Sequence, residues 1–168
     1  MIMNKFHPLT ITNITRLTID SVAISFDVSN NALFQFEAGQ YITIKQDING
    51  EEVRRAYSIC SMNAEGVTIG VKKVEQGRMS TFLTEIVNKG DVLQVMPPSG
   101  NFVIKGDNKH IVGICAGSGV TPIIAMIKTE LAKPSDAKFT LIYGNKTKDS
   151  SMFADELQQL QINNSDRL

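Results

Sequence analysis

Cysteine is scarce in this chain of 168 residues, which contains only Cys60 and Cys115. The two lie far apart and form no C-x-x-C pair, and two thiols are too few for a four-thiolate iron–sulfur cluster or zinc site. The sequence therefore predicts no metal centre within this chain. A disulfide between the two cysteines stays open as an alternative, but reduced, half-buried thiols in a cytoplasmic protein are the interpretation we favour.

Net charge is lacking as well, because seventeen basic residues are balanced by seventeen acidic ones. This balance favours neither a nucleic acid nor an anionic membrane as a partner. No apolar run is long enough for a transmembrane helix. The N-terminal stretch 1–8 has neither the apolar core nor the small-residue cleavage site of a signal peptide. We therefore expect a cytoplasmic protein that binds no nucleic acid and no membrane.

The first part of the chain, residues 1–106, has the pattern of β-structure. Apolar residues alternate with polar or small ones in several short runs, which end at turn-forming segments. The alternating positions are Leu9/Ile11, Ile24/Phe26/Val28, Ile42/Ile44 and Val67/Ile69/Val71. One interruption has helical spacing, with Phe82, Leu83, Ile86 and Val87 forming a predicted apolar stripe. The pattern predicts a six-stranded antiparallel Greek-key barrel with one short helix.

The second part, residues 107–168, has a different order. An apolar strand at 110–115 precedes a glycine-rich turn and a helix over 123–133, for which Thr121 is the predicted N-cap and Pro122 the first residue. A strand at 139–143 and a helix near 150–161 follow. This βαβα order predicts a parallel nucleotide-binding unit, but two parallel strands form an incomplete sheet. We expect a partial domain with a frayed polar tail at 163–168 and an open sheet edge through which the chain could self-associate.

The segment R-R-A-Y-S-I-C-S at 54–61 follows a predicted strand and carries the strongest chemical signal. Tyr57 could stack on an aromatic ring system, and Ser58 with nearby backbone amides could bind the ring edge. The guanidinium of Arg55 could bind a diphosphate in a bidentate manner. Strand alternation places Arg55 and Tyr57 on one face, toward one ligand. In isolation, a surface arginine beside a half-buried tyrosine explains the pattern equally well.

Two further segments have the character of phosphate sites. Gly77-Arg78-Met79-Ser80 stands at the start of the predicted short helix, where free amides and a glycine can cradle a phosphate. The segment 115–122, C-A-G-S-G-V-T-P, combines a strand end, a glycine turn and a helix start. It lacks the third glycine of the dinucleotide G-x-G-x-x-G pattern. Structural turn glycines are the alternative explanation for both segments.

A fourth segment, Y-G-N-K-T at 143–147, ends the second parallel strand, where doubly wound folds contact a ribose or a 2′-phosphate. All four segments resemble, in this order, motifs of the ferredoxin–NADP⁺ reductase superfamily: R-x-Y-S, G-x-x-S, G-x-G-x-[TA]-P and the strand-end segment. In detail, R-R-x-Y-S-I-C-S and Y-G-N-x-T resemble the reductase components of bacterial ring-hydroxylating oxygenases, especially the phenylacetyl-CoA epoxidase reductase type. The resemblance covers essentially the whole chain.

The resemblance implies FAD and NAD(P)H as cofactors and a ferredoxin-type iron–sulfur domain or oxygenase component as electron acceptor. It implies roles near the reacting flavin for Tyr57, Ser58 and Thr121. The residues implied to bind the cofactors are Arg55, Tyr57, Ser58, Ile59, Val71, Lys72, Gly77, Arg78, Met79, Ser80, Gly117, Ser118, Gly119, Thr121, Pro122, Gly144, Asn145 and Lys146. Lys146 stands where the family often has arginine, so a preference for NADPH is only weakly favoured.

Two functions remain open on the sequence. The first is a flavoprotein reductase that passes electrons from NAD(P)H through FAD to an iron–sulfur partner. The second is a flavin-binding or electron-transfer module without nicotinamide turnover. The intact motifs favour the reductase. The cysteine-spaced iron–sulfur segment and the Cys-Gly-Pro segment of related reductases are absent from these 168 residues, and this favours the module for the chain as it stands.

Overall fold

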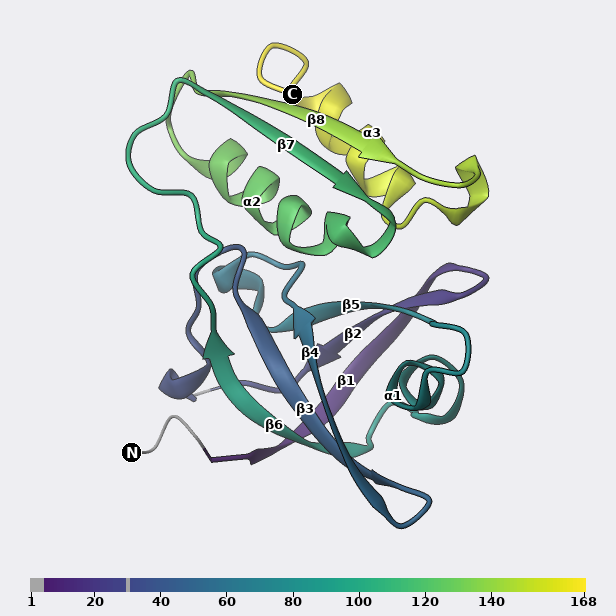
Figure 1. Ribbon diagram of the computed structural model, residues 1–168. Helices are drawn as coiled ribbons and strands as arrows, with labels where there is room; N and C mark the ends of the chain where they lie inside the picture. The colour runs from purple at the N-terminus through teal and green to yellow at the C-terminus, as the bar shows by residue number, and fades with distance from the viewer. Residues whose placement is uncertain (1–4, 30) are drawn as a thin grey trace.

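The computed structural model of the protein describes residues 5–29 and 31–168. Residues 1–4, which belong to the N-terminal stretch considered above, and residue 30 lie outside the described residues. Figure 1 shows two parts joined by one extended connection, with a curled antiparallel sheet below and a small parallel sheet with helices above. None of the helices among the described residues has both the length and the apolar character to cross a membrane.

The lower part is a six-stranded antiparallel sheet with the strand order β4-β3-β6-β1-β2-β5. Its strands are β1 His7–Thr18, β2 Ser21–Phe26, β3 Tyr41–Ile48, β4 Glu51–Ser58, β5 Thr68–Lys72 and β6 Val92–Ser99. The jump from β3 to β6 and back to β1 gives the predicted Greek-key connection. Just past the end of β4, Ile59 forms an isolated bridge to Ile69 of β5, and the described residues contain no strand pairing between these two edge strands. The sheet is therefore a half-barrel that stays open between β4 and β5.

The alternating apolar residues form the core of this half-barrel, as predicted. Leu9, Ile11, Ile24, Phe26, Ile42, Ile44, Val67, Ile69 and Val71 are all buried, whereas Val28 is half-buried and packs at the margin. Short 3₁₀ turns at Ala32–Phe34 and Asn63–Glu65 connect the strands. The alternation predicted the core because successive side chains of a strand point to opposite faces.

The predicted short helix is present as α1 Arg78–Thr81, which continues into a π-helical turn at Phe82–Ile86. Leu83 and Val87 are buried as expected, but Ile86 is 60% exposed. The prediction of a buried Ile86 was therefore wrong. A π-helical turn bonds residues five apart instead of four, so it rotates later side chains away from the stripe of a regular helix.

The upper part has the predicted βαβα order: β7 His110–Ala116, α2 Val120–Ala132, β8 Lys138–Gly144 and α3 Ala154–Asn163. Strands β7 and β8 pair in parallel along their whole length. The helices cover the face of the sheet that carries Phe139, while the other face exposes Val112, Ile114 and Ile142. Within the described part of the chain this sheet has two strands, so each strand has an edge without a partner strand there. Self-association through such an edge stays a prediction.

A shared apolar contact joins the two parts. Helix α2 lies between the parallel sheet and the half-barrel (Figure 1). Cys60 of the half-barrel is buried in one cluster with residues of the upper part, namely Val120, Ile124, Met152 and Phe153. An ion-paired lysine adds to the contact, because Lys128 of α2 binds Glu65 of the half-barrel at 2.9 Å and Glu156 of α3 at 3.1 Å.

The polar tail is not frayed as predicted, because Arg167 anchors it. Its guanidinium donates to the carbonyl oxygens of Glu130 (2.8 Å), Leu131 (3.0 Å) and Ala137 (3.1 Å). The first two belong to the last turn of α2, where helix carbonyls have no partner within the helix and the helix dipole is negative. Composition alone marked this segment as frayed, whereas the anchor depends on where the end of α2 lies in space.

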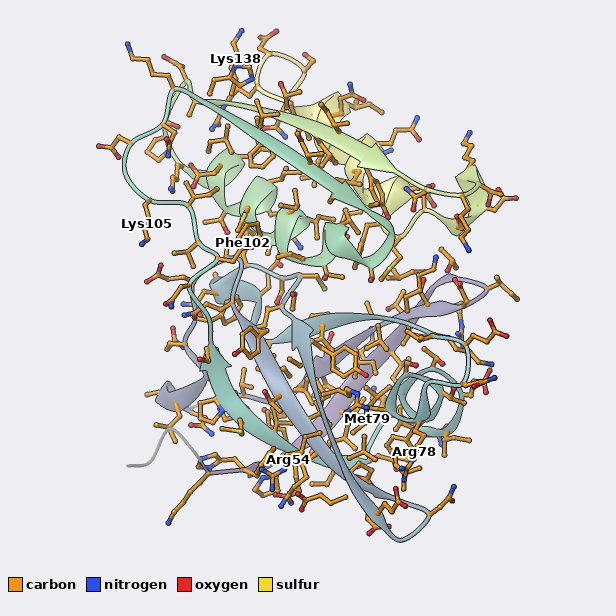
Figure 2. The ribbon with its side chains drawn as sticks, viewed as in Figure 1. Arg54, Arg78, Met79, Phe102, Lys105 and Lys138 are labelled. Carbon is orange, nitrogen blue, oxygen red and sulfur yellow. The ribbon has the colours of Figure 1, made fainter. Side chains whose placement is uncertain are left out.

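We expect Arg167→Met to lower the stability of the folded chain by about 1–3 kcal/mol, because it removes several hydrogen bonds from a charged donor. Thermal unfolding followed by circular dichroism would show the melting temperature fall by several degrees. Lys105→Met, at an exposed lysine of the connection (Figure 2), is the matched control and should melt like the wild type. Equal melting of all three proteins would contradict the anchoring role.

Candidate functional site

The open side of the half-barrel forms a cleft of about 620 Å³, called here the first cleft. It is lined by strand β4, strand β5, the loop into α1 and the start of α2. The lining residues are Arg55, Ala56, Tyr57, Ser58, Gly70, Lys72, Val74, Gln76, Gly77, Arg78, Met79, Ser80, Ser118, Gly119, Thr121 and Pro122. Three of the four predicted segments therefore meet at one place.

Arg55 and Tyr57 both line the first cleft, as their alternation predicted. In the sheet they pair with Ile44 and Ile42, which are buried in the core. Arg55 and Tyr57 thus lie on the side of the sheet that faces the core at β3. Because β4 is an edge strand, this side of the sheet opens into the cleft at β4. Burial raises the pKa of Tyr57 to about 12, although the charge of Arg55 nearby acts to lower it. The phenol therefore stays neutral in the physiological range.

The guanidinium of Arg55 is free to bind an anion. It donates to the backbone oxygen of Arg54 at 2.7 Å and forms no ion pair with any residue that the structure describes. Its neighbours are engaged differently: Arg54 pairs with Glu52, and Arg78 pairs with Glu51. An unpaired guanidinium in a cleft is suited to a phosphate or carboxylate ligand.

Two of the predicted residues have their side chains in the core instead of the cleft. Ile59 and Val71 are completely buried in the half-barrel, and neither lines the cleft. The amide of Ile59 is also engaged, since it donates to the oxygen of Gln40 at 3.0 Å. Val71 points away from the cleft because it lies between Gly70 and Lys72, and neighbouring strand residues face opposite sides. Ile59 lies past the end of β4, where its bridge to Ile69 closes the half-barrel over it. A role of these two residues in cofactor binding stays a prediction.

The segment Gly77–Ser80 forms the wall of the first cleft around the start of α1. The hydroxyl of Ser80 holds this turn together, because it accepts from the amide of Val74 at 3.1 Å and donates to the oxygen of Gly77 at 3.2 Å. Met79 is only 2% exposed and packs mainly in the core. The guanidinium of Arg78 also binds the oxygen of Ile48, so it is tied to the β3–β4 hairpin. Figure 2 shows Arg78 and Met79 beside β4. What the turn offers a ligand is mainly its backbone.

The glycine segment forms a 3₁₀ turn at Gly117–Gly119 between β7 and α2, called here the glycine loop. Gly117 has φ +51°, and a Cβ there would meet no atom within 4 Å, so this side of the loop is open to a ligand. The predicted N-cap was wrong: helix α2 begins at Val120, with Gly119 before it. The hydroxyl of Thr121 instead donates to the oxygen of Ser118 at 2.9 Å. Pro122 still lies in the first turn, where its missing N–H removes no helix bond.

A second cleft of about 640 Å³ lies at the carboxyl ends of β7 and β8. It is lined by Asp20, Lys72, Lys73, Ala116, Gly117, Ser118, Gly144, Asn145, Lys146 and Ser150. Lys72 and Ser118 line both clefts, so the two are adjacent. The ammonium of Lys72 binds the oxygen of Ser150 at 2.9 Å and lies 3.4 Å from the carboxylate of Asp20. It therefore links the half-barrel to the turn after the fourth segment.

Sequence reasoning missed several residues of the two clefts. Asp20 lies at the tip of the β1–β2 hairpin and Ser150 in the 3₁₀ turn Lys148–Ser150, and nothing local marks either of them. Gly70 did have a signal, since an isolated glycine inside a strand often marks a close approach of another segment. Thr121, Met152 and Phe153 of the upper part approach the space where a side chain at Gly70 would lie.

Comparison with known proteins agrees with this arrangement. Residues 8–104 match the oxidoreductase FAD-binding domain, and residues 114–168 match the oxidoreductase NAD-binding domain. One component of the 1,2-phenylacetyl-CoA epoxidase from Escherichia coli K12 is 38% identical over 99% of this chain and 48% of its own length. The ferredoxin reductase component of 3-ketosteroid-9-alpha-monooxygenase from Rhodococcus rhodochrous is 32% identical over 90% of this chain and 44% of its own length. The chain thus spans about half the length of these relatives.

Solved structures show the same fold. The flavohem-like FAD/NAD-binding domain of nitric oxide dioxygenase from Vibrio cholerae has a TM-score of 0.86 at 22% identity, covering 96% of this chain and 72% of that one. Phthalate dioxygenase reductase has a TM-score of 0.80 at 28% identity, covering 91% and 48%. The predicted resemblance and fold class are confirmed: the chain belongs to the ferredoxin–NADP⁺ reductase-like oxidoreductases, with an FAD-binding domain followed by NAD-binding sequence.

Proposed function

We propose that this chain is the flavin- and nucleotide-binding part of a reductase that passes electrons from NAD(P)H through FAD to an iron–sulfur carrier or oxygenase partner. The observation that carries the proposal is the meeting of the two clefts at Lys72 and Ser118. A flavin in the first cleft and a nicotinamide nucleotide in the second would reach each other there without a change of fold.

The first cleft has the chemistry that FAD requires. Arg55 supplies an unpaired guanidinium for the diphosphate, and the first turn of α1 supplies backbone amides without helix partners. Tyr57 supplies a neutral aromatic ring on the same wall, and Ser58 a hydroxyl for the ring edge. When bound, FAD accepts a hydride equivalent and releases electrons one at a time. The residues around it position and polarise it, and none needs to act as a general acid or base.

The second cleft has the chemistry of a nucleotide site. The glycine loop can approach a diphosphate closely, while Gly144 and Asn145 line the strand end where a ribose would lie. Lys146 forms no ion pair with any described residue and offers a point charge for a 2′-phosphate. We infer a modest preference for NADPH over NADH. Thr121, a buried residue of the first cleft beside Gly70, would orient the nicotinamide toward the flavin.

The acceptor is inferred from the relatives. Two of them are components of multicomponent oxygenases, and phthalate dioxygenase reductase is described as a modular structure for electron transfer from pyridine nucleotides to a 2Fe–2S centre. The buried Cys60 and the distant Cys115 are too few to hold such a cluster in this chain. We therefore place the iron–sulfur centre outside these 168 residues.

Absorbance spectroscopy and anaerobic rapid mixing would test the proposal. The chain, purified and supplied with FAD, should show bound-flavin absorbance in the visible range. Mixing with NADPH, and more slowly with NADH, should bleach that absorbance. Bound flavin that neither nucleotide bleaches would leave the alternative, a flavin-binding module without nicotinamide turnover. Failure to bind FAD at all would refute both.

A further inference from the structure

We propose that Tyr143 is a positioning residue for the nucleotide site: its hydroxyl holds the glycine loop in the orientation that turns backbone amides toward the ligand. This inference rests on the proposed function and extends it to a residue outside both clefts.

Two hydroxyl groups bind two consecutive carbonyls of the glycine loop. The phenol of Tyr143 donates to the oxygen of Gly117 at 3.0 Å, and the hydroxyl of Thr121 donates to the oxygen of Ser118 at 2.9 Å. In a trans peptide the N–H points opposite to the C=O of the same plane, and no described peptide bond here is cis. The amides of Ser118 and Gly119 therefore point away from these hydroxyls.

The first of these peptide planes needs such a restraint. The oxygen of Gly117 also accepts from the amide of Val120 within the 3₁₀ turn. Because Gly117 has no side chain and adopts a positive φ, these two hydrogen bonds are the main restraints on the plane that joins it to Ser118. The open space around its Cβ position means that side-chain packing does not hold it. The hydrogen bond from Tyr143 comes from a neighbouring strand, because β7 and β8 pair in parallel up to Ala116 and Gly144.

Tyr143 is itself anchored to a rigid part of the molecule. Its hydroxyl accepts a hydrogen bond from the amide of Met152 at 3.1 Å, and Met152 is completely buried. The next residue, Phe153, is also buried and has φ +59°, a strained conformation for a bulky residue that the surrounding packing must enforce. Both side chains lie against Gly70 of the half-barrel. The phenol thus connects the glycine loop to a turn that is packed at the contact between the two parts.

Tyr143→Phe tests this role because it keeps the ring and removes only the hydroxyl. We expect the NADPH concentration that half-saturates flavin bleaching to rise about tenfold, a typical cost of one lost hydrogen bond with a buried partner. The limiting bleaching rate and the affinity for FAD should stay within about twofold of the wild type. Tyr41→Phe, which removes a hydroxyl from a partly exposed ring on the half-barrel, is the matched control and should change nothing.

Amide hydrogen exchange gives a second readout that needs no nucleotide. In Tyr143→Phe, exchange should accelerate at residues 117–119 and at Met152, while the strands of the half-barrel exchange as in the wild type. Unchanged exchange and unchanged half-saturation would overturn the proposal. Faster amide exchange throughout the chain together with loss of FAD would also overturn the proposal, because that result indicates a general structural role for Tyr143. If NADPH does not bleach the flavin of the wild type, the proposed function fails. The hydrogen-exchange result then decides by itself whether Tyr143 holds the glycine loop.

Discussion

Gly70→Ala is expected to push the two parts of the molecule apart at the wall of the first cleft. An added Cβ would lie 2.5 Å from the methyl carbon of Thr121, and 3.2 Å from side-chain atoms of Met152 and of Phe153. Contact at 2.5 Å is not tolerated between carbon atoms, and all three neighbours are buried. Since Gly70 belongs to a paired strand of the half-barrel, the upper part must move away.

The expected cost is about 1–3 kcal/mol of stability, as for other overpacked sites. Because Gly70 and Thr121 both line the first cleft, FAD affinity should fall by about tenfold or more. Thermal melting and flavin fluorescence titration would measure the two effects. The double variant Gly70→Ala/Thr121→Ser lacks the clashing methyl group but keeps the hydroxyl, so it should recover much of both losses. An alanine variant that melts and binds FAD like the wild type would show that the contact is looser than the structure indicates.

Arg55→Ala is expected to weaken FAD binding by roughly 100-fold. Charge-assisted hydrogen bonds contribute about 1.5–3 kcal/mol each, and a guanidinium can form two with a diphosphate. The folded protein itself should lose little stability, because the guanidinium is exposed and bonds only to the neighbouring backbone. The loss should therefore appear in flavin retention on dialysis and in the measured dissociation constant, without a comparable fall in melting temperature.

Two variants give controls for Arg55. Arg54→Ala removes a guanidinium one residue away that does not line the first cleft and is paired with Glu52, so it should retain FAD. Arg55→Lys keeps a positive charge but loses the bidentate geometry, and we expect intermediate affinity. Equal flavin retention by the wild type and Arg55→Ala would remove the main support for the first cleft as a diphosphate site.

The sequence left two states open for Cys60 and Cys115, a disulfide or two reduced thiols. Burial raises the pKa of Cys60 to about 12, and its thiol donates to the oxygen of Thr68 at 3.3 Å. Burial also raises the pKa of Cys115. Both thiols are free, so neither is expected to react readily near neutral pH. The prediction of half-buried thiols holds for Cys115, whereas Cys60 is completely buried.

The sequence by itself determined the fold class, the order of strands and helices, and the family. Alternation of apolar residues, turn-forming segments and phosphate-binding glycines are local properties, which a chain displays before it folds. The same holds for Arg55 and Tyr57, since the geometry of a single strand directs both to one side.

Only the tertiary structure decided which neighbours of these motifs line the two clefts. The gap between β4 and β5 opens the core face at Tyr57 but leaves the side chains of Ile59 and Val71 buried. Contacts between residues far apart in the chain, such as Lys72 with Ser150 and Arg167 with the end of α2, follow from how the elements pack. No local pattern encodes such distances, because they are set by the sum of all packing interactions in the folded chain.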